Sequence, residues 1–478
     1  MFVAREKELK KLNSLLIRKK SSFLAIYGRR RVGKTEIVRY FCEQNNIKKV
    51  EFAGRVDQNR TQQLKAFESK LKRVYGVKSD ERIKDWNDAF YLLISYLETF
   101  NKKEKIVVFL DELPWMDTAK SGFLGELADF WNDFCSQRTN IILIVCGSAA
   151  SYMMKKVIHN RGALHGRLTD IMPMEQFDLN ATKKMLEVQG CKYSDKSIVD
   201  TYMVLGGVAK YLESINCSLT QTQSIDSLCF KKDALLKYEY EALFSSLFND
   251  SKTHYSVMDA LSSKWTGHTQ KELAILVGVS STYIKKPLEE LLSSGFITAT
   301  TKFKQNKREI LYRATDCFSY FHNKWMSGKN KNWNSIVNSQ SYRSWAGFAF
   351  ENICYMHSEH IKKVLGISGV ETQSHYWNYV ADKKTEKGVQ IDMMLEHTNG
   401  SNNIDIIECK YYNQEFTITK AYRDDLVRKI EVFNEQTKFR YNIRLIFITS
   451  FGMVKNEYYN EMVNVDICLS DIIGVELN

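Results

Sequence analysis

The sequence predicts an α/β chain of about three domains, with a parallel sheet in its first third and a second α/β domain in its last third. Its 478 residues exceed what one ordinary hydrophobic core holds. Residues 23–27 and 106–110 are continuous apolar runs, which is typical of buried parallel strands. Residues 389–395 and 404–410 flank a turn at 399–403 and predict a β-hairpin.

The composition favours a globular protein with an anionic partner. Apolar residues make up 44% of the chain, and the formal net charge is +12. An excess of basic residues suits nucleic acid, so DNA is the partner that we expect. The N-terminus is charged at once, and no run reaches the length of a membrane span, so we expect a cytoplasmic protein with no membrane contact.

The cysteines and histidines predict neither disulfides nor zinc. The ten cysteines include no C-x-x-C pair, and several lie in strand-like runs, which indicates a reducing compartment and no disulfide framework. His357 and His360 share a predicted helix without other ligands nearby. We expect them on a solvated helix face rather than in a zinc site.

A glycine-rich loop joins the first strand to a helix over residues 36–44. Its pattern, G-x-x-x-x-G-K-T, comprises Gly28, Arg29, Arg30, Arg31, Val32, Gly33, Lys34 and Thr35, and Glu36 follows it. Strand, loop and helix in this order predict a P-loop whose backbone N–H groups hold the phosphates of ATP or ADP. Lys34 would reach the β- and γ-phosphates, and Thr35 would ligate Mg²⁺. The alternative, a basic turn before a helix, does not explain this context.

Two carboxylates follow the second strand, and a serine ends the third. Asp111 would hold the Mg²⁺ shell, and Glu112 would orient or deprotonate the attacking water. The alternative is a strand end with two solvated acids. Residues 141–147 predict the third strand, after which Ser148 would sense the γ-phosphate, cap the next helix, or do both.

A glycine-punctuated loop at residues 160–167 carries two arginines. Arg167 is our candidate for neutralising charge in the transition state, in its own subunit or in a neighbouring copy of the chain. The alternative is a surface loop with ordinary salt bridges.

Together these motifs carry a family resemblance. Phe2, Arg5, Glu6 and residues 28–35, 109–115, 146–151 and 164–167 resemble the archaeal-type ATPases, which belong with the AAA+-like and signal-transducing P-loop ATPases. The resemblance covers about residues 1–245. It implies a P-loop ATPase core over residues 1–172 and a helical lid over 173–250, with Ala209 where the family usually has proline.

Residues 251–325 have the spacing of a winged helix-turn-helix. Thr269 opens one short helix, Gly278 closes it, and Ser280 opens a second. Strands at 295–297 and 310–312 would then flank a lysine-rich wing tip at residues 302–308.

The winged helix has two possible uses. Lys285 and Lys286 on its second helix, with the wing lysines, would contact DNA phosphates. The alternative is a winged helix used for packing or protein contact, because DNA would repel Glu289 and Glu290 on the same helix.

The C-terminal hairpin gathers acids around a lysine. Glu408 and Lys410 point to the same side of one strand, and the hairpin brings Asp392 alongside. Asp392 and Glu408 would hold Mg²⁺, Lys410 would position or activate water for attack on a phosphate, and Glu351 would complete the metal shell from a helix at 342–365. The alternative is a hairpin with one exposed acid–lysine pair. Lys429, on the next helix, is expected on a solvated face.

A second resemblance covers about residues 340–450. Trp345, Gly347, Phe350 and Glu351, with Ile391–Asp392 and Glu408–Cys409–Lys410, resemble the PD-(D/E)XK nuclease-like domain that follows archaeal-type ATPases in one uncharacterised family. This resemblance implies a restriction-endonuclease-like α/β domain over residues 326–478 and assigns Asp392, Glu408 and Lys410 as catalytic residues.

The sequence therefore predicts an ATP-binding and ATP-hydrolysing switch whose winged helix and nuclease-like domain act on DNA, in mobile-element or defence biology by extrapolation. A rival hypothesis is a regulatory or signalling ATPase whose nuclease-like domain only binds protein or DNA. A third is a DNA-binding regulator that uses the winged helix alone.

Overall fold

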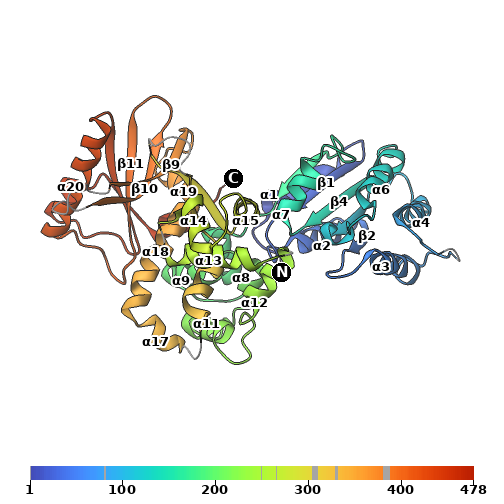
Figure 1. Cartoon of the computed structure of the whole chain (residues 1–478), viewed down its shortest axis with the longest axis horizontal. Coiled ribbons are helices and arrows are strands. Elements are labelled where there is room, and N and C mark those ends of the chain that lie inside the picture. The colour runs from blue at the N-terminus through green and yellow to red at the C-terminus, as the bar shows by residue number, and fades with distance from the viewer. Residues whose placement is uncertain are drawn as a thin grey trace. The chain divides into compact units, whose positions relative to one another are not determined.

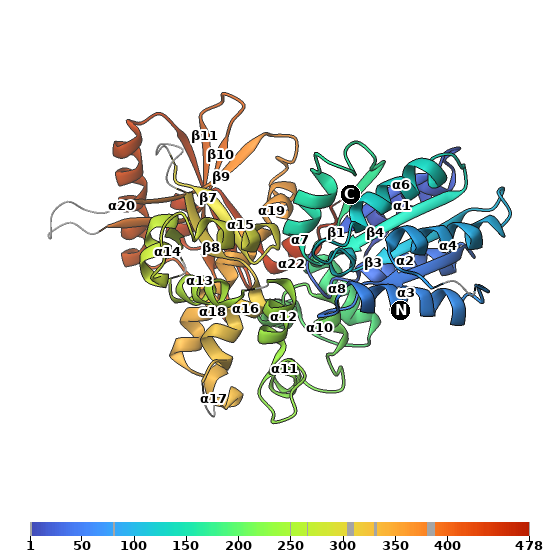
Figure 2. The same cartoon turned by 45° about the vertical axis from the view of Figure 1, so that its right-hand side comes forward.

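A computed structural model describes residues 2–79, 82–248, 250–264, 266–303, 310–328, 332–379 and 388–477. The chain folds as two compact units, shown as ribbons in Figures 1 and 2. The N-terminal unit comprises Met1–Gln176 with Leu243–Asn249, and the C-terminal unit comprises Phe177–Ala242 with Asp250–Asn478. Within the described ranges, every helix is too short or too polar to cross a membrane.

The N-terminal unit contains a five-stranded, fully parallel sheet in the order β2-β3-β4-β1-β5. The strands are β1 Ser22–Tyr27, β2 Lys48–Ala53, β3 Ile106–Asp111, β4 Ile141–Gly147 and β5 Asp170–Pro173. All residues of β3 and β4 are buried, as their continuous apolar sequences require. The predicted parallel sheet is confirmed.

Helices cover both faces of this sheet, because alternate residues of each central strand point to opposite faces (Figure 1). Leu24 and Ile26 pack with α1 Glu6–Leu16 and α2 Lys34–Gln44. Phe23 and Ala25 pack on the opposite side. The elements on that side include α3 Arg60–Arg73, α4 Trp86–Glu98, α5 Leu113–Met116, α6 Phe123–Asp129, η1 Phe130–Cys135 and η2 Met153–Ile158. A further short helix is α7 Ala150–Tyr152.

The segment after β5 is helical, as expected for residues 173–250. Its helices are α8 Leu179–Val188, α9 Asp195–Leu205, α10 Ala209–Glu213, α11 Gln221–Cys229 and α12 Glu239–Leu247. The expected boundary at residue 172 falls inside β5, and the unit boundary lies at Gln176 instead. Whether the segment acts as a lid stays a prediction.

Two cysteines of this segment form a disulfide, so the prediction of a chain without disulfides is wrong at this pair. Cys191 and Cys217 are joined, with their Cα atoms 4.5 Å apart. They are 26 residues apart in the sequence, so no short-range cysteine motif marks them, and the fold of the helices brings them together.

Helices and strands follow one another over residues 252–314, and the winged helix-turn-helix expected there stays a prediction. They are α13 Lys252–Ser263, α14 Gln270–Val277, α15 Lys285–Ser293, β6 His268–Thr269, β7 Ile297–Thr301 and β8 Ile310–Ala314, the strands in the order β6-β8-β7. Thr269 caps α14 through a capping box with Glu272. The second helix begins at Lys285 rather than at Ser280, because the Ser280 hydroxyl accepts the N–H of Tyr283 within a separate turn.

The base of the expected wing packs on the C-terminal sheet. Lys302 forms a β-bridge with Tyr376, and the N–H of Phe303 donates to the carbonyl of Tyr376 at 3.1 Å. The Phe303 ring is buried against Phe433 and Tyr441. Of the expected tip, residues 304–308 lie outside the described residues.

The C-terminal sheet is mixed, in the order β13-β12-β11-β10-β9. Its strands are β9 Thr372–Tyr379, β10 Val389–His397, β11 Asn403–Lys410, β12 Asn442–Thr449 and β13 Val465–Cys468. The predicted hairpin is antiparallel β10–β11, and β11, β12 and β13 run parallel. The helices of this part are α16 Cys317–Phe321, η3 His322–Met326, α17 Trp333–Val337, α18 Gln340–Met356, α19 Ser358–Val364, α20 Lys420–Thr437, α21 Glu457–Met462 and α22 Leu469–Ile473. Figure 2 shows α20 beside this sheet.

The helix expected over residues 342–365 is divided at His357 into α18 and α19, and its two histidines are not solvated. His357 is 2% exposed and its Nε2 lies 3.1 Å from the backbone N of Leu179. The Nε2 of His360 lies 3.0 Å from a carboxylate oxygen of Asp178. Burial lowers the pKa of His357 to about 4. Both histidines therefore join α18 and α19 to α8, and the expected solvated face is wrong.

Candidate functional site

The glycine-rich loop between β1 and α2 has a backbone that only certain residues allow. Gly28 has a φ of 151°, and a Cβ there would lie 2.0 Å from the carbonyl oxygen of Met174. Gly33 has a φ of 97° and precedes the first residue of α2. Both positions therefore require glycine, which fixes the curl of the loop against the helix N-terminus.

Lys34 spans this loop with its side chain. Its ammonium donates to the carbonyl oxygens of Gly28 at 2.9 Å and Arg29 at 2.8 Å, and to the hydroxyl of Ser148 at 3.0 Å. The residue is 5% exposed. A buried cation at the mouth of a glycine loop is suited to hold a phosphate group.

Thr35 and Asp111 meet across the sheet edge. The Thr35 hydroxyl donates to a carboxylate oxygen of Asp111 at 2.7 Å. Burial raises the pKa of Asp111, and the hydrogen bond from Thr35 opposes that rise. A hydroxyl beside a carboxylate is the oxygen donor set that suits Mg²⁺ in nucleotide sites, so these two residues fit the predicted ion.

Glu112 and Ser148 form the second contact between neighbouring strand ends. The Ser148 hydroxyl donates to the Glu112 carboxylate at 2.5 Å, and the Ser148 N–H donates to it at 3.2 Å. Glu112 has a φ of 47°, a left-handed conformation that is uncommon for this residue type and concentrated at functional sites. The four predicted residues Lys34, Asp111, Glu112 and Ser148 therefore lie in one connected group with Thr35.

The remaining predicted residues of the loop lie around this group. Arg29 and Val32 are buried, whereas Arg30 and Arg31 are partly exposed. Glu36 pairs with Arg39 on the surface of α2. Sequence reasoning gave no role to Arg5, whose guanidinium donates to the carbonyls of Val32 at 3.1 Å and Glu175 at 2.7 Å. Arg5 was visible only as part of the family motif.

Arg167 is not joined to the connected group by any contact that the described residues show. Its guanidinium donates to the side chain of Asn132 at 2.9 Å and to the carbonyl of His165 at 3.0 Å. These contacts match the surface-loop alternative within one copy of the chain, and a role toward a neighbouring copy stays a prediction.

A second group of charged residues lies in the C-terminal unit around Glu408, which is fully buried on β11. Its carboxylate accepts hydrogen bonds from Lys410 at 2.9 Å, Lys429 at 2.7 Å and the Tyr422 hydroxyl at 2.7 Å (heavy-atom distances). Burial alone would raise the pKa of Glu408, but the charges of Lys410 and Lys429 outweigh it and hold the pKa at about 2. Glu408 is therefore ionised at any working pH.

Asp392 and Lys410 complete the predicted trio. The two strands of the hairpin bring the Lys410 ammonium to 3.7 Å from the Asp392 carboxylate. Burial, followed by the charge of Glu408, raises the pKa of Asp392 to about 6, while Lys410 and Lys429 oppose the rise. The hairpin brings Asp392, Glu408 and Lys410 together, as the sequence predicted. The alternative, a hairpin with one exposed acid–lysine pair, does not match these contacts.

Glu351 lies on α18, and its electrostatic environment differs from that of Glu408. Burial, followed by the charge of Asp392, raises the pKa of Glu351 to about 9. Its Oε2 is buried without a hydrogen-bond partner among the described residues. At neutral pH Glu351 is therefore protonated in this environment and can donate a hydrogen bond.

The predicted three-carboxylate metal shell is not assembled. Among the residues that the structure describes, His, Cys, Asp and Glu side chains nowhere gather in groups of three or more with the spacing of a metal site. The physical reason is that Lys410 and Lys429 lie against Glu408, while Glu351 carries a proton. Two carboxylates, Asp392 and Glu408, remain as possible ligands.

Sequence reasoning assigned Lys429 to a solvated face, which is wrong, and it missed Tyr422 and Arg313. Lys429 and Tyr422 are both on α20 and both reach Glu408. Their seven-residue spacing, two helical turns, was the available signal. Arg313 on β8 is 3% exposed, with its guanidinium 5.4 Å from the ring centre of Tyr355 and 4.9 Å from that of Tyr376. The positive charge of Arg313 opposes the rise in the pKa of Glu351.

The raised pKa of Glu351 predicts a pH-dependent gain in stability for Glu351→Gln. An acid with a raised folded-state pKa contributes stability that is present below its unfolded pKa, 4.5, and is lost as pH rises toward about 9. Between pH 4.5 and 7 the free energy of unfolding of the wild type should fall by up to about 3 kcal/mol, whereas that of the glutamine variant should not show this fall.

Urea unfolding in the presence of EDTA at pH 5, 6, 7 and 8 measures this difference. The exposed residue Glu415 provides the control variant, Glu415→Gln, which should follow the wild type at every pH. Parallel stability profiles for wild type and Glu351→Gln would contradict the assignment of a buried, protonated Glu351.

The surface of the helix-turn-helix carries both basic and apolar side chains. Lys285 and Lys286 are exposed on α15. Glu290 turns its carboxylate to His254, 2.9 Å away on α13, so only Glu289 of the two acids is left fully on the exposed surface. Glu289 is therefore the acid of α15 that would face DNA beside Lys285 and Lys286.

Comparisons with known proteins agree with the N-terminal site. Residues 2–215 match a family described as an ATPase domain predominantly from Archaea. An uncharacterised protein of Methanocaldococcus jannaschii is 24% identical over 437 residues, which are 90% of this chain and 92% of that protein. An uncharacterised ATP-binding protein of the same organism is 43% identical over 49 residues, 10% of this chain and 83% of that protein.

Solved structures resemble the fold at low sequence identity. The Walker-type ATPase of Pyrococcus abyssi has 15% identity and a TM-score of 0.50, over 68% of this chain and 96% of that one. The ORC2 protein of Aeropyrum pernix, solved as ADPNP–ADP complexes, has 16% identity and a TM-score of 0.45, over 68% of this chain and 92% of that one. The Pyrococcus structure supports the α/β fold.

Proposed function

We propose that this chain, whose residues 2–215 form an ATPase domain of the family found predominantly in Archaea, is a Mg²⁺-dependent ATP-hydrolysing switch that controls a DNA-cleaving C-terminal unit. In the N-terminal unit, Lys34 would hold the phosphates, Thr35 and Asp111 would hold Mg²⁺, and Glu112 would take the proton of the attacking water. Ser148, which contacts both Lys34 and Glu112, would report whether a γ-phosphate is present.

The observation that carries the nuclease half is the buried meeting of Asp392, Glu408 and Lys410 at the end of the β10–β11 hairpin. Burying two carboxylates costs free energy unless cations or hydrogen bonds compensate them. A structural ion pair needs one acid and one base, whereas here two acids, two lysines and a tyrosine hydroxyl converge. Clusters with such strongly shifted pKa values are concentrated at catalytic sites.

Asp392 and Glu408 would hold a Mg²⁺ ion once Lys410 and Lys429, which contact Glu408 in the structure, turn to the phosphate of the substrate. Mg²⁺ in phosphate-processing sites is commonly bound by one or two protein carboxylates, the rest of its ligands being water and phosphate oxygens. Such an ion, when bound, supplies charge neutralisation at the phosphate and lowers the pKa of a water molecule. Glu351, which is protonated beside these two carboxylates, would donate a hydrogen bond rather than bind the metal.

The two lysines and the tyrosine would act on the substrate directly. Lys410 and Lys429 are donors without acceptor capacity, so they suit the non-bridging oxygens of a phosphodiester. Their charges would stabilise the additional negative charge that develops when water attacks the phosphorus atom. The net charge of +12 supports DNA as the polymer that presents this phosphate.

Cleavage of DNA by the purified chain tests this proposal. Supercoiled plasmid should be nicked or linearised in the presence of Mg²⁺ and ATP, and EDTA should abolish the reaction. Intact plasmid under all conditions, with ATP hydrolysis retained, would contradict the nuclease half and leave a regulatory ATPase. A mobile-element or defence role would rest on the nuclease half alone.

DNA binding through the helix-turn-helix predicts a specific salt effect for Lys285→Ala combined with Lys286→Ala. Each lysine that neutralises a phosphate contributes about 0.9 to the slope of log affinity against log salt, so the double variant should lower the slope by about 2. Fluorescence anisotropy with a labelled duplex between 50 and 200 mM salt gives the slope. The neighbouring exposed pair in the helical segment, Lys231→Ala with Lys232→Ala, is the control; equal slopes in all three proteins would exclude this surface.

A second candidate function, a regulatory ATPase that binds a protein, is favoured by apolar side chains on the same helix-turn-helix. Ile275 is 72% exposed, Leu276 57% and Tyr283 54%. Neighbouring exposed apolar residues are typical of protein contact surfaces. A DNA-binding affinity that survives loss of Lys285 and Lys286 but a plasmid that stays intact would favour this function.

A further inference from the structure

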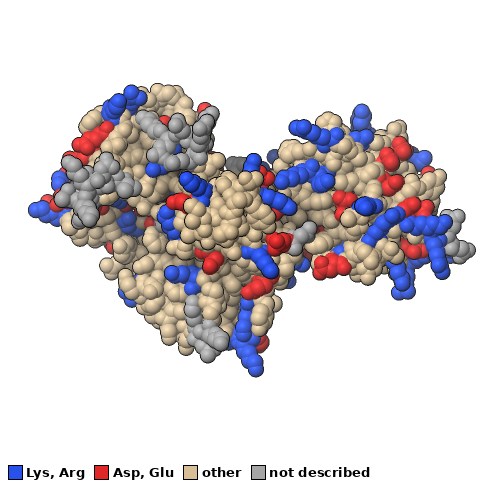
Figure 3. Space-filling view, in the orientation of Figure 1, with Lys and Arg blue, Asp and Glu red and all other residues tan. Residues whose placement is uncertain are grey.

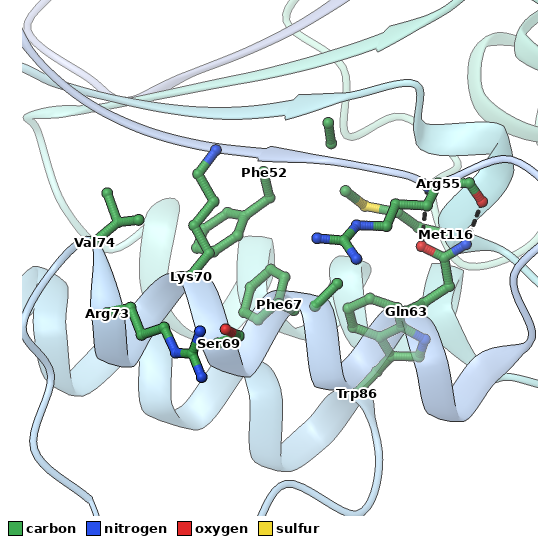
Figure 4. A pocket seen from close by; sticks show the side chains of 12 residues that line it. Phe52, Arg55, Gln63, Phe67, Ser69, Lys70, Arg73, Val74, Trp86 and Met116 are labelled. Carbon is green, nitrogen blue, oxygen red and sulfur yellow. Dashed lines mark hydrogen bonds between the residues drawn. The ribbon is translucent and has the colours of Figure 1, made fainter.

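A cavity of about 340 Å³ lies in the N-terminal unit, apart from the predicted phosphate-binding residues. Its walls come from the end of β2, from α3, from Trp86 at the start of α4 and from Met116 at the end of α5. Figure 4 shows these side chains. The volume lies within the range of small-molecule sites, roughly 300–1,000 Å³.

The lining combines an apolar wall with hydrogen-bond donors. Phe52, Phe67, Trp86 and Met116 supply the apolar wall, all of them buried. The charged side chains on the lining are Arg55, Lys70 and Arg73, and among the described residues no acidic one lines the cavity. In Figure 4 the guanidinium of Arg55 reaches over the cavity toward Phe67, Lys70 rises from α3, and Arg73 extends from the same helix in the opposite direction. Figure 3 shows Lys and Arg side chains gathered over α3.

The three cations are not neutralised within the part of the chain that the structure describes. No carboxylate there lies within ion-pair distance of Arg55, Lys70 or Arg73, although neighbouring Lys72 pairs with Glu68 at 2.9 Å. Burial lowers the pKa of Lys70, which is the effect expected of a cation that is held partly out of water. A ligand in this cavity would therefore have to bring the negative charge.

The cavity shares its wall with the ATPase site. Ala53 of β2 lies opposite Asp111 of β3, and the N–H of Gly54 donates to the Asp111 carbonyl at 2.9 Å. A Cβ at Gly54 would lie 2.4 Å from the carbonyl oxygen of Glu112, so this contact is tight. Met116 is the last residue of α5, and Glu112 is the N-cap residue that precedes this helix. A ligand against Ala53 and Met116 thus presses on the backbone that positions Asp111 and Glu112.

We propose that this cavity binds a small organic anion, with an apolar body and a phosphate or carboxylate group, and that its occupancy changes the rate of ATP hydrolysis. The apolar body would cover Phe67 and Met116. The oxyanion would accept hydrogen bonds from Arg55 and Arg73, the two arginines on the lining. The inference rests on the proposed ATPase function and not on the nuclease half.

Binding of two probes that share one apolar body tests the site and separates the two anions. Phenyl phosphate and benzoate are titrated by calorimetry into the full chain carrying Lys34→Ala, which removes the phosphate-holding cation of the ATP site. At least one probe should bind, and benzyl alcohol, which lacks the charge, should bind at least tenfold more weakly. Absence of binding by both anions overturns the proposal.

Variants locate the binding and separate it from general anion affinity. Arg55→Gln combined with Arg73→Gln should weaken binding of the probe at least tenfold. Lys65→Gln, on an exposed position of α3 outside the lining, should leave affinity unchanged. Equal affinity in the Arg55/Arg73 variant overturns the site.

The link to hydrolysis has its own readout. In the chain with Lys34 intact, saturating probe should change the ATP hydrolysis rate by at least twofold, and the Arg55/Arg73 variant should abolish that response. A rate that does not respond, although the probe binds, overturns the link to Glu112. A chain that binds the probe but does not hydrolyse ATP contradicts the proposed function instead, so the two failures are distinguishable.

Discussion

Replacing Glu112 with glutamine should lower the rate of ATP hydrolysis by a factor of about 10²–10⁴ while ATP stays bound. Glutamine keeps the size and the hydrogen bond with Ser148 but cannot take a proton from the attacking water. Because Lys34, Thr35 and Asp111 are unchanged, phosphate and metal binding should persist. Single-turnover hydrolysis and equilibrium binding of ATP measure the two effects separately.

Two further variants fix the interpretation of the Glu112 result. Lys34→Ala should lose nucleotide affinity together with hydrolysis, since its ammonium is the cation inside the glycine loop. Glu104→Gln changes an exposed acid that precedes the same strand and should hydrolyse ATP like the wild type. Normal turnover in Glu112→Gln would assign the base to another residue.

Replacing Asp392 with asparagine should lower DNA cleavage by at least about a hundredfold, because a metal ion held by one carboxylate fewer loses about 3 kcal/mol of transition-state stabilisation. The side chain is largely buried beside Lys410, so the isosteric amide preserves packing. Plasmid nicking with Mg²⁺ is the measurement, and ATP hydrolysis in the same protein should be unchanged.

The pH dependence of cleavage provides an independent check on Asp392. Its pKa is raised to about 6, so the carboxylate becomes protonated as pH falls through that value. Because Mg²⁺ bound by Asp392 would compete with this proton, cleavage by the wild type at subsaturating Mg²⁺ should fall as the pH drops below 6, whereas the residual cleavage by Asp392→Asn should not follow this profile. Identical profiles for both proteins would contradict the role of Asp392.

Local sequence rules predicted the N-terminal site well because its residues follow one another closely along the chain. A strand, a glycine loop and a helix place Gly28 to Thr35 by local backbone geometry alone. Asp111 and Ser148 each follow a strand of the same parallel sheet, and parallel strands bring their carboxyl ends to one edge. Periodicity and spacing were therefore sufficient to gather these side chains.

The C-terminal site was predicted only in part, because its members depend on contacts between distant elements. The β10–β11 hairpin fixes Asp392, Glu408 and Lys410 by local pairing. Lys429 reaches Glu408 only because α20 lies along the sheet; its spacing from Tyr422 places both on one helix face but does not state what that face contacts. The burial that protonates Glu351 likewise depends on how α18 packs against β11, and sequence spacing does not contain it.

The same reasoning explains the errors about cysteine and histidine. Cys191 and Cys217 are paired by the packing of helices rather than by a short motif. His357 and His360 have the spacing of a helix face. The helix expected to carry both is divided at His357, and the two histidines contact α8. In both cases the local pattern was described correctly, but the sequence did not indicate which distant residue each side chain would contact.

The measurement that tests the central claim most directly is the rate of plasmid cleavage by the full chain with Mg²⁺ in the presence of ATP, of ADP and of no nucleotide. We expect that the rate depends on the nucleotide, that Glu112→Gln with bound ATP keeps the ATP-state rate, and that Asp392→Asn cleaves at least about a hundredfold more slowly than the wild type in all three conditions. Equal cleavage in all three nucleotide conditions, or no cleavage by the wild type in any of them, would contradict a switch that controls a nuclease.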